Sequence, residues 1–379
     1  MPRKIVTIVY NTAFYVYKFR MNLIKDLMSQ GYDVVVLSPV DEYVEVLQRN
    51  GIEHVAIAMS QYGMNPLKEL LSTIDIYNKL KRLSPVCSLH YTIKPNIFGS
   101  LAARMAGVPV VNNIAGAGRA FSERKSLFAR FIVLLYKLGL SKSYHVFFQN
   151  NDDMELFLRS GAVNPDIVGR LPGSGVDLEK YSDNPATVDD GIFRFLFVGR
   201  LLKEKGIVEY LKASKLILNS RMDREIHFEV VGELDGTSAC IDKSTLSEFL
   251  QDKRFIYHGT VSPDVMPDIL GNVDCVVLPS YYGEGVPRSL LEAAALSKAI
   301  ITTDSVGCRE VVDEGVNGFK VPVRDVRALT FSMEKILRMT PEELGKMGVA
   351  GRKKVVKEFD EAIVLKAYRD IVQSIPSKD

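Results

Sequence analysis

Short runs of apolar, mostly β-branched residues alternate with longer polar or amphipathic stretches along this chain of 379 residues. In the first half the runs read KIVTIVY, YDVVVLS, HVAIAM, VCSLHYT, VPVVNNI and HVFFQN. Strand-like runs that alternate with helical patterns are the signature of βαβ units and parallel sheets. Several runs are apolar at successive residues, as expected of strands that helices cover on both faces. The pattern therefore predicts an α/β fold with doubly wound sheets.

The alternation stops in a passage rich in Pro, Asp and Gly at Tyr181–Gly191 and then starts again with FRFLFVG, IHFEVVG, RFIYHG, CVVLPS and AIITTD. At roughly 100 to 200 residues per domain, the length favours two domains. We therefore predict two Rossmann-like domains, residues 1–186 and 187–379, with a C-terminal helix that packs at the end or crosses back to the first domain. Ligands of such sheets bind outside the carboxyl ends of the strands, which predicts an active site in the cleft between the domains.

Composition and termini narrow the class of protein. A hydrophobic fraction of 47% excludes wholesale disorder, and a charged fraction of 25% excludes a polytopic membrane protein. No apolar run reaches the ~18 residues of a membrane span, and the N-terminus lacks a signal-peptide pattern, which predicts a cytoplasmic protein. The four cysteines have no disulfide or zinc spacing, so we expect small buried hydrophobes. They are Cys87, Cys240, Cys275 and Cys308.

The net charge of +2 hides an uneven distribution. Residues 1–185 carry 21 basic and 16 acidic side chains, a balance of +5, whereas residues 186–379 carry 27 and 30, a balance of −3. Between Lys79 and Lys142 there are eleven basic residues and one acidic residue, Glu123. Such a segment attracts an anionic partner.

The segment Leu278–Ala295, LPSYYGEGVPRSLLEAAA, predicts a strand end, a Gly-rich loop and a helix. Pro287 suits the first helical position, and the N–H groups of Arg288 and Ser289 would then point at an anion such as a diphosphate. Two carboxylates, Glu284 and Glu292, indicate hydroxyl binding beside that anion. The alternative is an ordinary Gly-rich helix entry with a surface glutamate.

A second segment, FVGRLLKEKG at Phe197–Gly206, also follows a strand. It places Arg200 and Lys205 where a crevice is expected, and two fixed cations can neutralise a diphosphate leaving group. A solvated basic turn is the alternative for this segment alone.

These two segments, with HGTVSPDVMPDILGNVDC and GCREVVDEGVNGFKVP, closely resemble the C-terminal domain of glycosyltransferase family 4, retaining nucleotide-sugar enzymes of GT-B fold. The spacing from Glu284 to Glu292 matches that family's E-x7-E signature. The first domain, with YTIKPNIFGSLAARMAGVPVVNNIAGAG, is similar to the subgroup that adds N-acetylgalactosamine or a related sugar to a polyprenyl-diphosphate saccharide in bacterial glycan assembly.

The resemblance implies a UDP leaving group, retention of the anomeric configuration, no cofactor and no catalytic metal. It implies that Arg200 and Lys205 bind the diphosphate, that Glu292 holds the ribose hydroxyls, and that Glu284 lies beside the donor sugar. The implied catalytic residues are Arg200, Lys205 and Glu284, and the implied donor-binding residues are Gly285, Val286, Pro287, Arg288, Ser289 and Glu292.

The first domain departs from the family at one position. Many members carry a histidine just after the strand that matches VPVVNNI, but this chain has Ala115 there, so no catalytic histidine is assigned. His90 lies near a strand end, and both a core position and a place in the cleft stay open for it. The acceptor-binding candidates are Asn11, Arg20, Lys94, Asn96, Gly116 and Gly118.

Among these candidates, Lys94 ends a strand and precedes a helix that starts near Asn96, which would direct a charge and amide groups at a phosphate. The alternative is that Lys94 is solvated and Asn96 only caps the helix. At the first βα turn Asn11 stands in place of the family's common Gly pair.

The segment Arg124–Lys142 combines many large apolar residues, such as Phe131, Leu134 and Leu138, with five basic ones and is typical of a helix at an anionic membrane surface. A core helix with basic ends is the alternative. Together these features predict a retaining glycosyltransferase on the inner face of the cytoplasmic membrane that moves a hexose from a UDP-sugar to a polyprenyl-diphosphate saccharide. A soluble acceptor, a non-catalytic nucleotide-sugar-binding module and, more weakly, a nucleic-acid-binding protein remain as alternatives.

Overall fold

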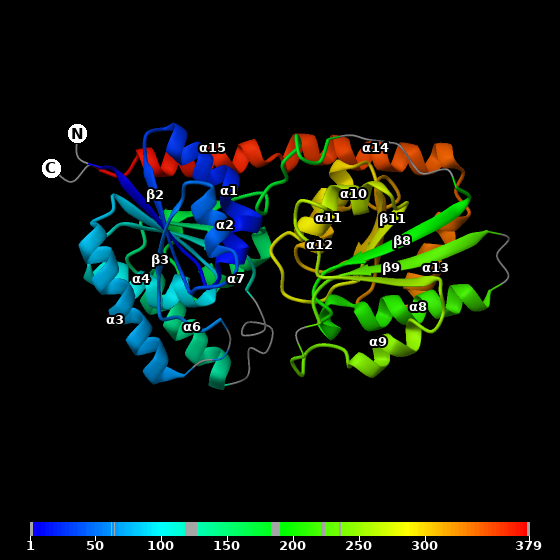
Figure 1. The fold of residues 1–379 in the computed structure, drawn as a ribbon, viewed down its shortest axis with the longest axis horizontal. Helices are drawn as coiled ribbons and strands as arrows, with labels where there is room; N and C mark the ends of the chain where they lie inside the picture. Colours follow the sequence, from blue (N-terminus) through cyan, green and yellow to red (C-terminus); the bar gives the residue numbers. More distant parts are fainter. Residues whose placement is uncertain are drawn as a thin grey trace. The chain divides into compact units, whose positions relative to one another are not determined.

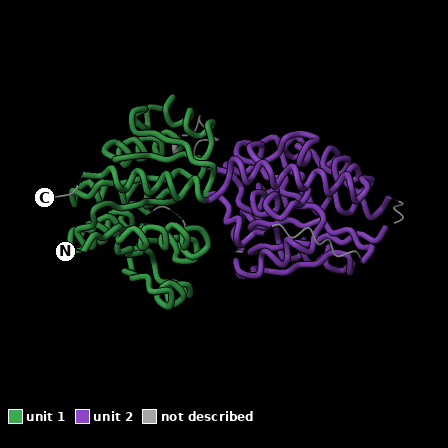
Figure 2. The backbone as a smooth tube through the Cα atoms, turned by 90° about the horizontal axis from the view of Figure 1, so that it is seen from above, with its two compact units in different colours: residues 1–174, 362–379 green, residues 175–361 purple. Residues whose placement is uncertain are grey.

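The computed structural model describes residues 3–61, 63, 65–117, 127–182, 190–220, 224–234 and 236–376, with only the backbone at 127 and 128. The chain forms two compact units (Figure 2). Unit 1 comprises residues 1–174 and 362–379, and unit 2 comprises residues 175–361. We predicted the boundary near 187, but residues from Gly175 onward pack in unit 2. The N–H of Val176 donates to the Phe359 carbonyl at 2.9 Å, and Tyr181 belongs to the unit 2 core.

Among its described residues, unit 1 contains a seven-stranded parallel sheet in the order β3-β2-β1-β4-β5-β6-β7. The central strands β1, β4 and β5 are buried at every residue, as the continuous apolar runs predict. The strands are β1 (Ile5–Val9), β2 (Asp33–Ser38), β3 (Glu53–Ala56), β4 (Cys87–Tyr91), β5 (Val110–Ile114), β6 (His145–Phe148) and β7 (Val168–Arg170).

Helices cover both faces of this sheet (Figure 1). One face packs against α1 (Ala13–Ser29), α2 (Val44–Arg49) and α15 (Glu361–Gln373). The other face packs against α3 (Pro66–Leu83), the π-helical turn η1 (Pro95–Gly99), α4 (Ser100–Met105) and α6 (Leu127–Leu140). The remaining elements of unit 1 are α7 (Asn151–Arg159) and η2 (Pro165–Ile167).

The last helix, α15, is an integral part of unit 1. Its Tyr368 is fully buried and accepts a hydrogen bond from the Asn113 amide on β5 at 2.9 Å. Arg369 pairs with Asp26 of α1 at 2.8 Å. The sequence left open whether this helix crosses back, and these contacts place it against the sheet of unit 1.

Unit 2 contains, in its described part, a six-stranded parallel sheet in the order β10-β9-β8-β11-β12-β13. The strands are β8 (Ile192–Val198), β9 (Glu225–Val231), β10 (Phe255–Gly259), β11 (Cys275–Leu278), β12 (Ala299–Thr303) and β13 (Gly318–Val321). The helical elements are η3 (Lys203–Lys205), α8 (Ile207–Asn219), α9 (Lys243–Phe249), α10 (Met266–Gly271), α11 (Arg288–Ala295), α12 (Cys308–Val311), α13 (Val326–Leu337) and α14 (Pro341–Glu358).

Each unit therefore has the doubly wound architecture that the sequence predicts. The strand order reverses between β1 and β4 in unit 1 and between β8 and β11 in unit 2. Such reversals leave a crevice at the carboxyl ends of the two strands, where open α/β sheets bind their ligands. The four cysteines are buried, as expected.

Close packing of α14 holds α11, the helix that follows β11. The backbone of Gly348 in α14 lies so near the carbonyl of Ser297, just beyond α11, that a Cβ at this position would overlap it. Gly345, one turn earlier, has nothing within 4 Å of the same position. The two glycines lie in one helix but differ in their surroundings.

We expect Gly348→Ala to lower the free energy of unfolding of unit 2 by about 1–3 kcal/mol, because either α14 or the Ser297 backbone must shift. Gly345→Ala is the matched control and should raise the free energy of unfolding by up to about 1 kcal/mol, because alanine has a higher helix propensity than glycine. Urea unfolding followed by circular dichroism measures both. Equal effects of the two substitutions would contradict the close approach.

Candidate active site

Two loops meet at the carboxyl ends of β8 and β11. The N–H of Tyr281, after β11, donates to the carbonyl of Glu204 in η3 at 2.8 Å. This backbone hydrogen bond fixes the separation between the loop that carries Lys205 and the loop that carries Glu284. The site candidates of unit 2 therefore gather at its topological switch point.

Lys205 and Glu284 form an ion pair, with Nζ 2.5 Å from Oε2. The side chains are 16% and 12% exposed, so the pair is mostly screened from water. Ser280 donates from its hydroxyl to the other carboxylate oxygen, Oε1, at 2.7 Å. An ammonium group has three donors, so the pairing with Glu284 still allows Lys205 to bind an anion.

The start of α11 holds a second charged pair. Arg288 donates from Nε to Oε1 of Glu292, one turn later, at 2.9 Å, and the side chains are 14% and 6% exposed. Tyr181 lies against this pair, and burial, followed by the charge of Glu292, raises its pKa. Pro287 is the N-cap residue and makes no side-chain cap bond, so α11 starts at Arg288, one residue later than predicted.

The Gly-rich loop itself is packed against the turn before α12. Gly285, Val286 and Pro287 are buried, whereas Ser289 in the first turn of α11 is partly exposed. Gly307 has a φ of 79°, and a Cβ at that position would overlap the carbonyl oxygen of Gly285. The loop conformation therefore depends on a glycine from a different βα turn.

Arg200 lies between β8 and η3, at the same edge of the sheet as Lys205. It is partly exposed, and its carbonyl accepts the N–H of Leu202 at 2.7 Å. The structure thus places the three catalytic candidates, Arg200, Lys205 and Glu284, at one edge, and directly joins the last two.

In unit 1, Lys94 is not solvated. It is 7% exposed, and its Nζ lies 2.7 Å from Oε1 of Glu69 and donates to the Ser60 hydroxyl at 2.5 Å. Neither oxygen of Glu69 has a well-directed hydrogen bond among the described residues, so the contact is mainly electrostatic. Lys94 therefore has a local counter-ion, and its binding of an acceptor phosphate stays a prediction.

Asn96 belongs to a buried amide network. Its Nδ2 donates to the carbonyl of Asn113 at 2.8 Å, and its Oδ1 accepts from Asn112 at 2.9 Å. His90 lies in the core between the hydroxyls of Ser88 and Ser100, and burial lowers its pKa to about 3. The imidazole is therefore neutral, and the core position that the sequence left open for His90 is the one found.

The remaining acceptor candidates differ in their placement. Arg20 is 3% exposed, with its guanidinium carbon 4.1 Å from the centroid of the Tyr91 ring. Asn11 follows β1 at the switch point, and its Oδ1 is buried with no hydrogen-bond partner among the described residues. Gly116 follows β5, with a φ of 140°, whereas Gly118 lies outside the described residues.

Asp153 contacts the loop after β5, which carries two of the acceptor candidates, and the sequence reasoning missed it. It lies in the first turn of α7, accepts from the Asn150 amide at 2.7 Å, and receives a backbone hydrogen bond from Ala117. Burial raises its pKa to about 6. It thereby holds the loop after β5, where many members of the resembled family carry histidine.

Ser280 and Gly307 were missed as well. No local motif marks either residue, because each acts through a contact with a different βα loop. The described residues contain no group of three or more His, Cys, Asp or Glu side chains that could hold a metal ion.

Comparison with known proteins assigns each unit to a family. Residues 4–150 match the family described as glycosyl transferase 4-like, and residues 182–354 match glycosyl transferases group 1. The chain belongs to the glycosyltransferases of GT-B fold, with one of the two Rossmann-like domains of that fold in each half.

Two curated relatives share most of their length with this chain. One is the N,N'-diacetylbacillosaminyl-diphospho-undecaprenol alpha-1,3-N-acetylgalactosaminyltransferase of Campylobacter jejuni, 28% identical over 95% of this chain and 97% of the relative. The other is the UDP-Gal:alpha-D-GlcNAc-diphosphoundecaprenol alpha-1,3-galactosyltransferase of Escherichia coli, 26% identical over 78% of this chain and 76% of the relative.

Solved structures share the fold at lower identity. HepE of Anabaena, in complex with UDP and glucose, has a TM-score of 0.79 at 15% identity and covers 98% of this chain and 100% of its own. Sucrose-phosphate synthase of Thermosynechococcus elongatus also has a TM-score of 0.79, at 16% identity, over 98% of this chain and 99% of its own. The doubly wound fold predicted from the sequence is thus confirmed as GT-B.

We expect Gly307→Ala to raise the KM for the donor at least tenfold, because the new methyl group must displace the Gly285 loop. Gly315→Ala is the matched control, with a similar φ of 72° but nothing within 4 Å of the added Cβ. It should cost only backbone strain, roughly 1 kcal/mol of stability. Steady-state kinetics and thermal unfolding separate the two effects, and an equal KM in both variants would contradict the packing argument.

The raised pKa of Asp153 predicts a pH-dependent stability. In the folded protein, the carboxyl group of Asp153 keeps its proton up to a pH of about 6, whereas in the unfolded chain it releases the proton near pH 3.8. Stability therefore falls as pH rises between these values, by up to about 3 kcal/mol, and is flat above them. Asp153→Asn should remove this component. Urea unfolding of both proteins at pH 4.5, 5.5 and 7 measures it, and parallel pH profiles would contradict the assignment.

Proposed function

We propose that this glycosyltransferase moves an N-acetylated hexose, such as N-acetylgalactosamine, from a UDP-sugar to an undecaprenyl-diphosphate-linked saccharide. The acceptor would serve a bacterial surface glycan such as an O-antigen, a capsule or a glycoprotein glycan. Two relatives that match most of this chain are named for undecaprenyl-diphosphate acceptors. The observation that carries the proposal is the Lys205–Glu284 pair at the switch point of a nucleotide-binding type of sheet.

On the donor side, the UDP diphosphate binds Arg200, Lys205 and the first N–H groups of α11. The partial positive charge at the helix N-terminus and the two cationic side chains together neutralise the negative charge of a diphosphate. Glu292 takes the ribose hydroxyls, and Glu284 lies beside the sugar. The loop Gly285–Ser289 contacts the sugar and phosphate.

The transfer breaks the bond between the anomeric carbon and the β-phosphate oxygen and forms a bond to the acceptor oxygen on the same face of the sugar. The departing phosphate accepts the proton of the acceptor hydroxyl, so the configuration is retained and UDP leaves. Arg200 and Lys205 stabilise the charge that develops on the β-phosphate. We propose that these side chains do so without a cofactor or metal ion.

The acceptor side lies in unit 1, with Asn11, Arg20, Lys94, Asn96, Gly116 and Gly118 as the candidates from the sequence. Eight described basic residues of segment 79–142 attract an anionic membrane, although Lys79 and Lys94 are paired with acids of α3. In α6, Ile132 faces the core, whereas Phe131, Leu134 and Leu138 are about half exposed. The helix thus has a buried apolar face and an exposed apolar face, and the exposed face supports the proposal of membrane contact.

No described helix is long and apolar enough to cross a bilayer. We propose that the chain binds the inner face of the cytoplasmic membrane peripherally, through the exposed apolar face of α6 and its basic neighbours. Binding to nucleic acid is not proposed.

The proposal is tested with a panel of UDP-sugars and short polyprenyl-diphosphate saccharides, with the product identified by mass and by the NMR signal of its anomeric proton. The expected result is a product of retained configuration from a UDP-N-acetylhexosamine, at a rate that EDTA leaves unchanged. An inverted product, or transfer only to water-soluble sugars, would refute it.

In the same assay we expect Lys205→Ala to lower kcat at least 100-fold, since it removes a cation that stabilises the leaving group. Lys203→Ala is the matched control, because Lys203 lies in the same turn but is exposed. It should retain near wild-type turnover. Thermal unfolding checks that both variants are folded, and near-normal turnover of Lys205→Ala would remove Lys205 from the mechanism.

A further inference from the structure

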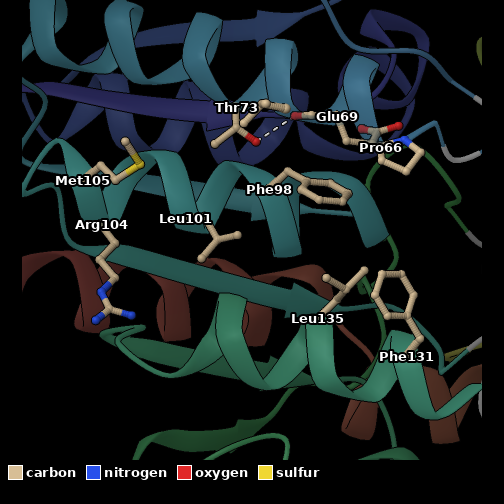
Figure 3. Close-up of a pocket in the computed structure, with 10 residues that line it drawn as sticks. Pro66, Glu69, Thr73, Phe98, Leu101, Arg104, Met105, Phe131 and Leu135 are labelled. Carbon is tan, nitrogen blue, oxygen red and sulfur yellow. Dashed lines mark hydrogen bonds between the residues drawn. The ribbon is translucent and has the colours of Figure 1, made fainter.

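Unit 1 contains an apolar groove of about 800 Å³ between α3, η1, α4 and α6 (Figure 3). Its size falls in the range of pockets that bury a small organic ligand. The apolar side chains that line it include Leu70, Phe98, Leu101, Phe131 and Leu135. Because Leu70 is 57% and Phe131 50% exposed, the groove holds hydrophobic surface that a folded protein normally buries.

The groove has a direction. Helices α3 and α6 and the turn η1 begin at the carboxyl edge of the sheet and run toward the opposite edge, because each follows a parallel strand. Pro66 and Phe131 therefore mark the end near the carboxyl edge, whereas Arg104 and Met105 mark the far end (Figure 3). From Pro95 to Met105 the floor is about 16 Å long at about 1.5 Å per residue.

Charge is placed at the two ends and not along the middle. Glu69 lines the groove near the carboxyl edge and contacts the ammonium group of Lys94, which is a candidate for binding the acceptor phosphate. Arg104 is exposed at the other end and donates to the Ser141 hydroxyl at 3.3 Å. At the carboxyl edge, where acceptor binding is proposed, the lining carboxylate of Glu69 is therefore paired with the ammonium group of Lys94 behind it.

We propose that this groove binds the first isoprene units of the polyprenyl acceptor, with the diphosphate at the Lys94 end. The inference rests on the proposed function and adds a binding site for the lipid tail. A single hydrocarbon chain fits a concave channel, whereas a flat bilayer surface contacts convex exposed faces such as that of α6. Segment 79–142, which contains η1, α4 and α6, has eight described basic residues and no described acidic one, and this balance favours a ligand with an anionic head.

The same charge disfavours a second copy of this chain as the occupant. A two-fold dimer through this face would bring the basic segment 79–142 of one copy against that of the other. The acids Asp75 and Glu69 of α3 pair with Lys79 and Lys94, so the other described basic residues of that segment carry this repulsion.

The chain contains no tryptophan, so a single introduced tryptophan reports on the groove alone. Leu70 lines the groove, while its neighbour Leu71 is similarly exposed, at 63%, but does not. We expect a prenyl monophosphate of 20 carbons to give a saturable blue shift of the fluorescence of Leu70→Trp and little change for Leu71→Trp. A straight-chain alkyl phosphate of equal carbon number should bind at least tenfold more weakly.

Three outcomes would overturn this site. The first is the absence of a saturable fluorescence shift in Leu70→Trp, and the second is an equal shift in Leu70→Trp and Leu71→Trp. The third is equal binding of the prenyl phosphate and the straight-chain phosphate. The second indicates surface partition, and the third indicates a site for any hydrocarbon chain.

Transfer kinetics supply a second test. Leu101→Trp should fill the groove and raise the KM for a long-chain polyprenyl-diphosphate saccharide at least tenfold, while an acceptor with a single isoprene unit keeps its wild-type kinetics. Leu71→Trp is the control and should resemble wild type with both acceptors.

If Leu101→Trp leaves the long-chain KM unchanged, the groove inference fails and the proposed function stands. If Leu70→Trp binds the prenyl phosphate but wild type transfers no sugar to any prenyl acceptor, the proposed function fails instead.

Discussion

The ion pair between Lys205 and Glu284 joins the two loops on which the proposed donor site depends. Each residue follows a different central strand, β8 or β11, and the pair lies where the strand order reverses. Without Glu284, the ammonium group would be a mostly buried charge with no counter-ion, which is costly. The backbone bond from Tyr281 to Glu204 and the contact of Gly307 with the Gly285 loop set the distance at which the pair forms. Loop packing and charge pairing therefore support each other.

The two units use charge differently at corresponding edges. In unit 2, the cations Lys205 and Arg288 each have a carboxylate partner within 2.9 Å, yet lie at an edge suited to a diphosphate. In unit 1, Lys94 is more deeply buried, and its partner Glu69 also lines an apolar groove. Because each of these cations is paired with a carboxylate, none is an isolated buried charge when no ligand is bound. The same pairing requires a ligand to compete with, or share, an existing partner.

Much of this architecture could be predicted, because periodicity and strand-end position are local properties of the sequence. The continuous apolar runs identify strands buried on both faces, and the E-x7-E spacing identifies the loop before α11. Arg20 shows the limit of such reasoning, since the sequence made it an acceptor-binding candidate but did not show that its guanidinium stacks on the buried ring of Tyr91. Asp153 was missed, because its contact with Ala117 spans 36 residues and leaves no local signal.

The sequence by itself determined the doubly wound sheets, the glycosyltransferase class and the strand ends that carry the charged residues. Hydrophobic periodicity and short motifs are set by residues close together in the chain, and the class followed from the resemblance of those motifs to a known family. The tertiary structure decided which side chains meet, including Lys205 with Glu284, Lys94 with Glu69, and α15 with the sheet of unit 1. It also formed the apolar groove from α3, the continuous segment of η1 and α4, and α6. These outcomes depend on packing between distant segments, where sequence spacing carries no distance information.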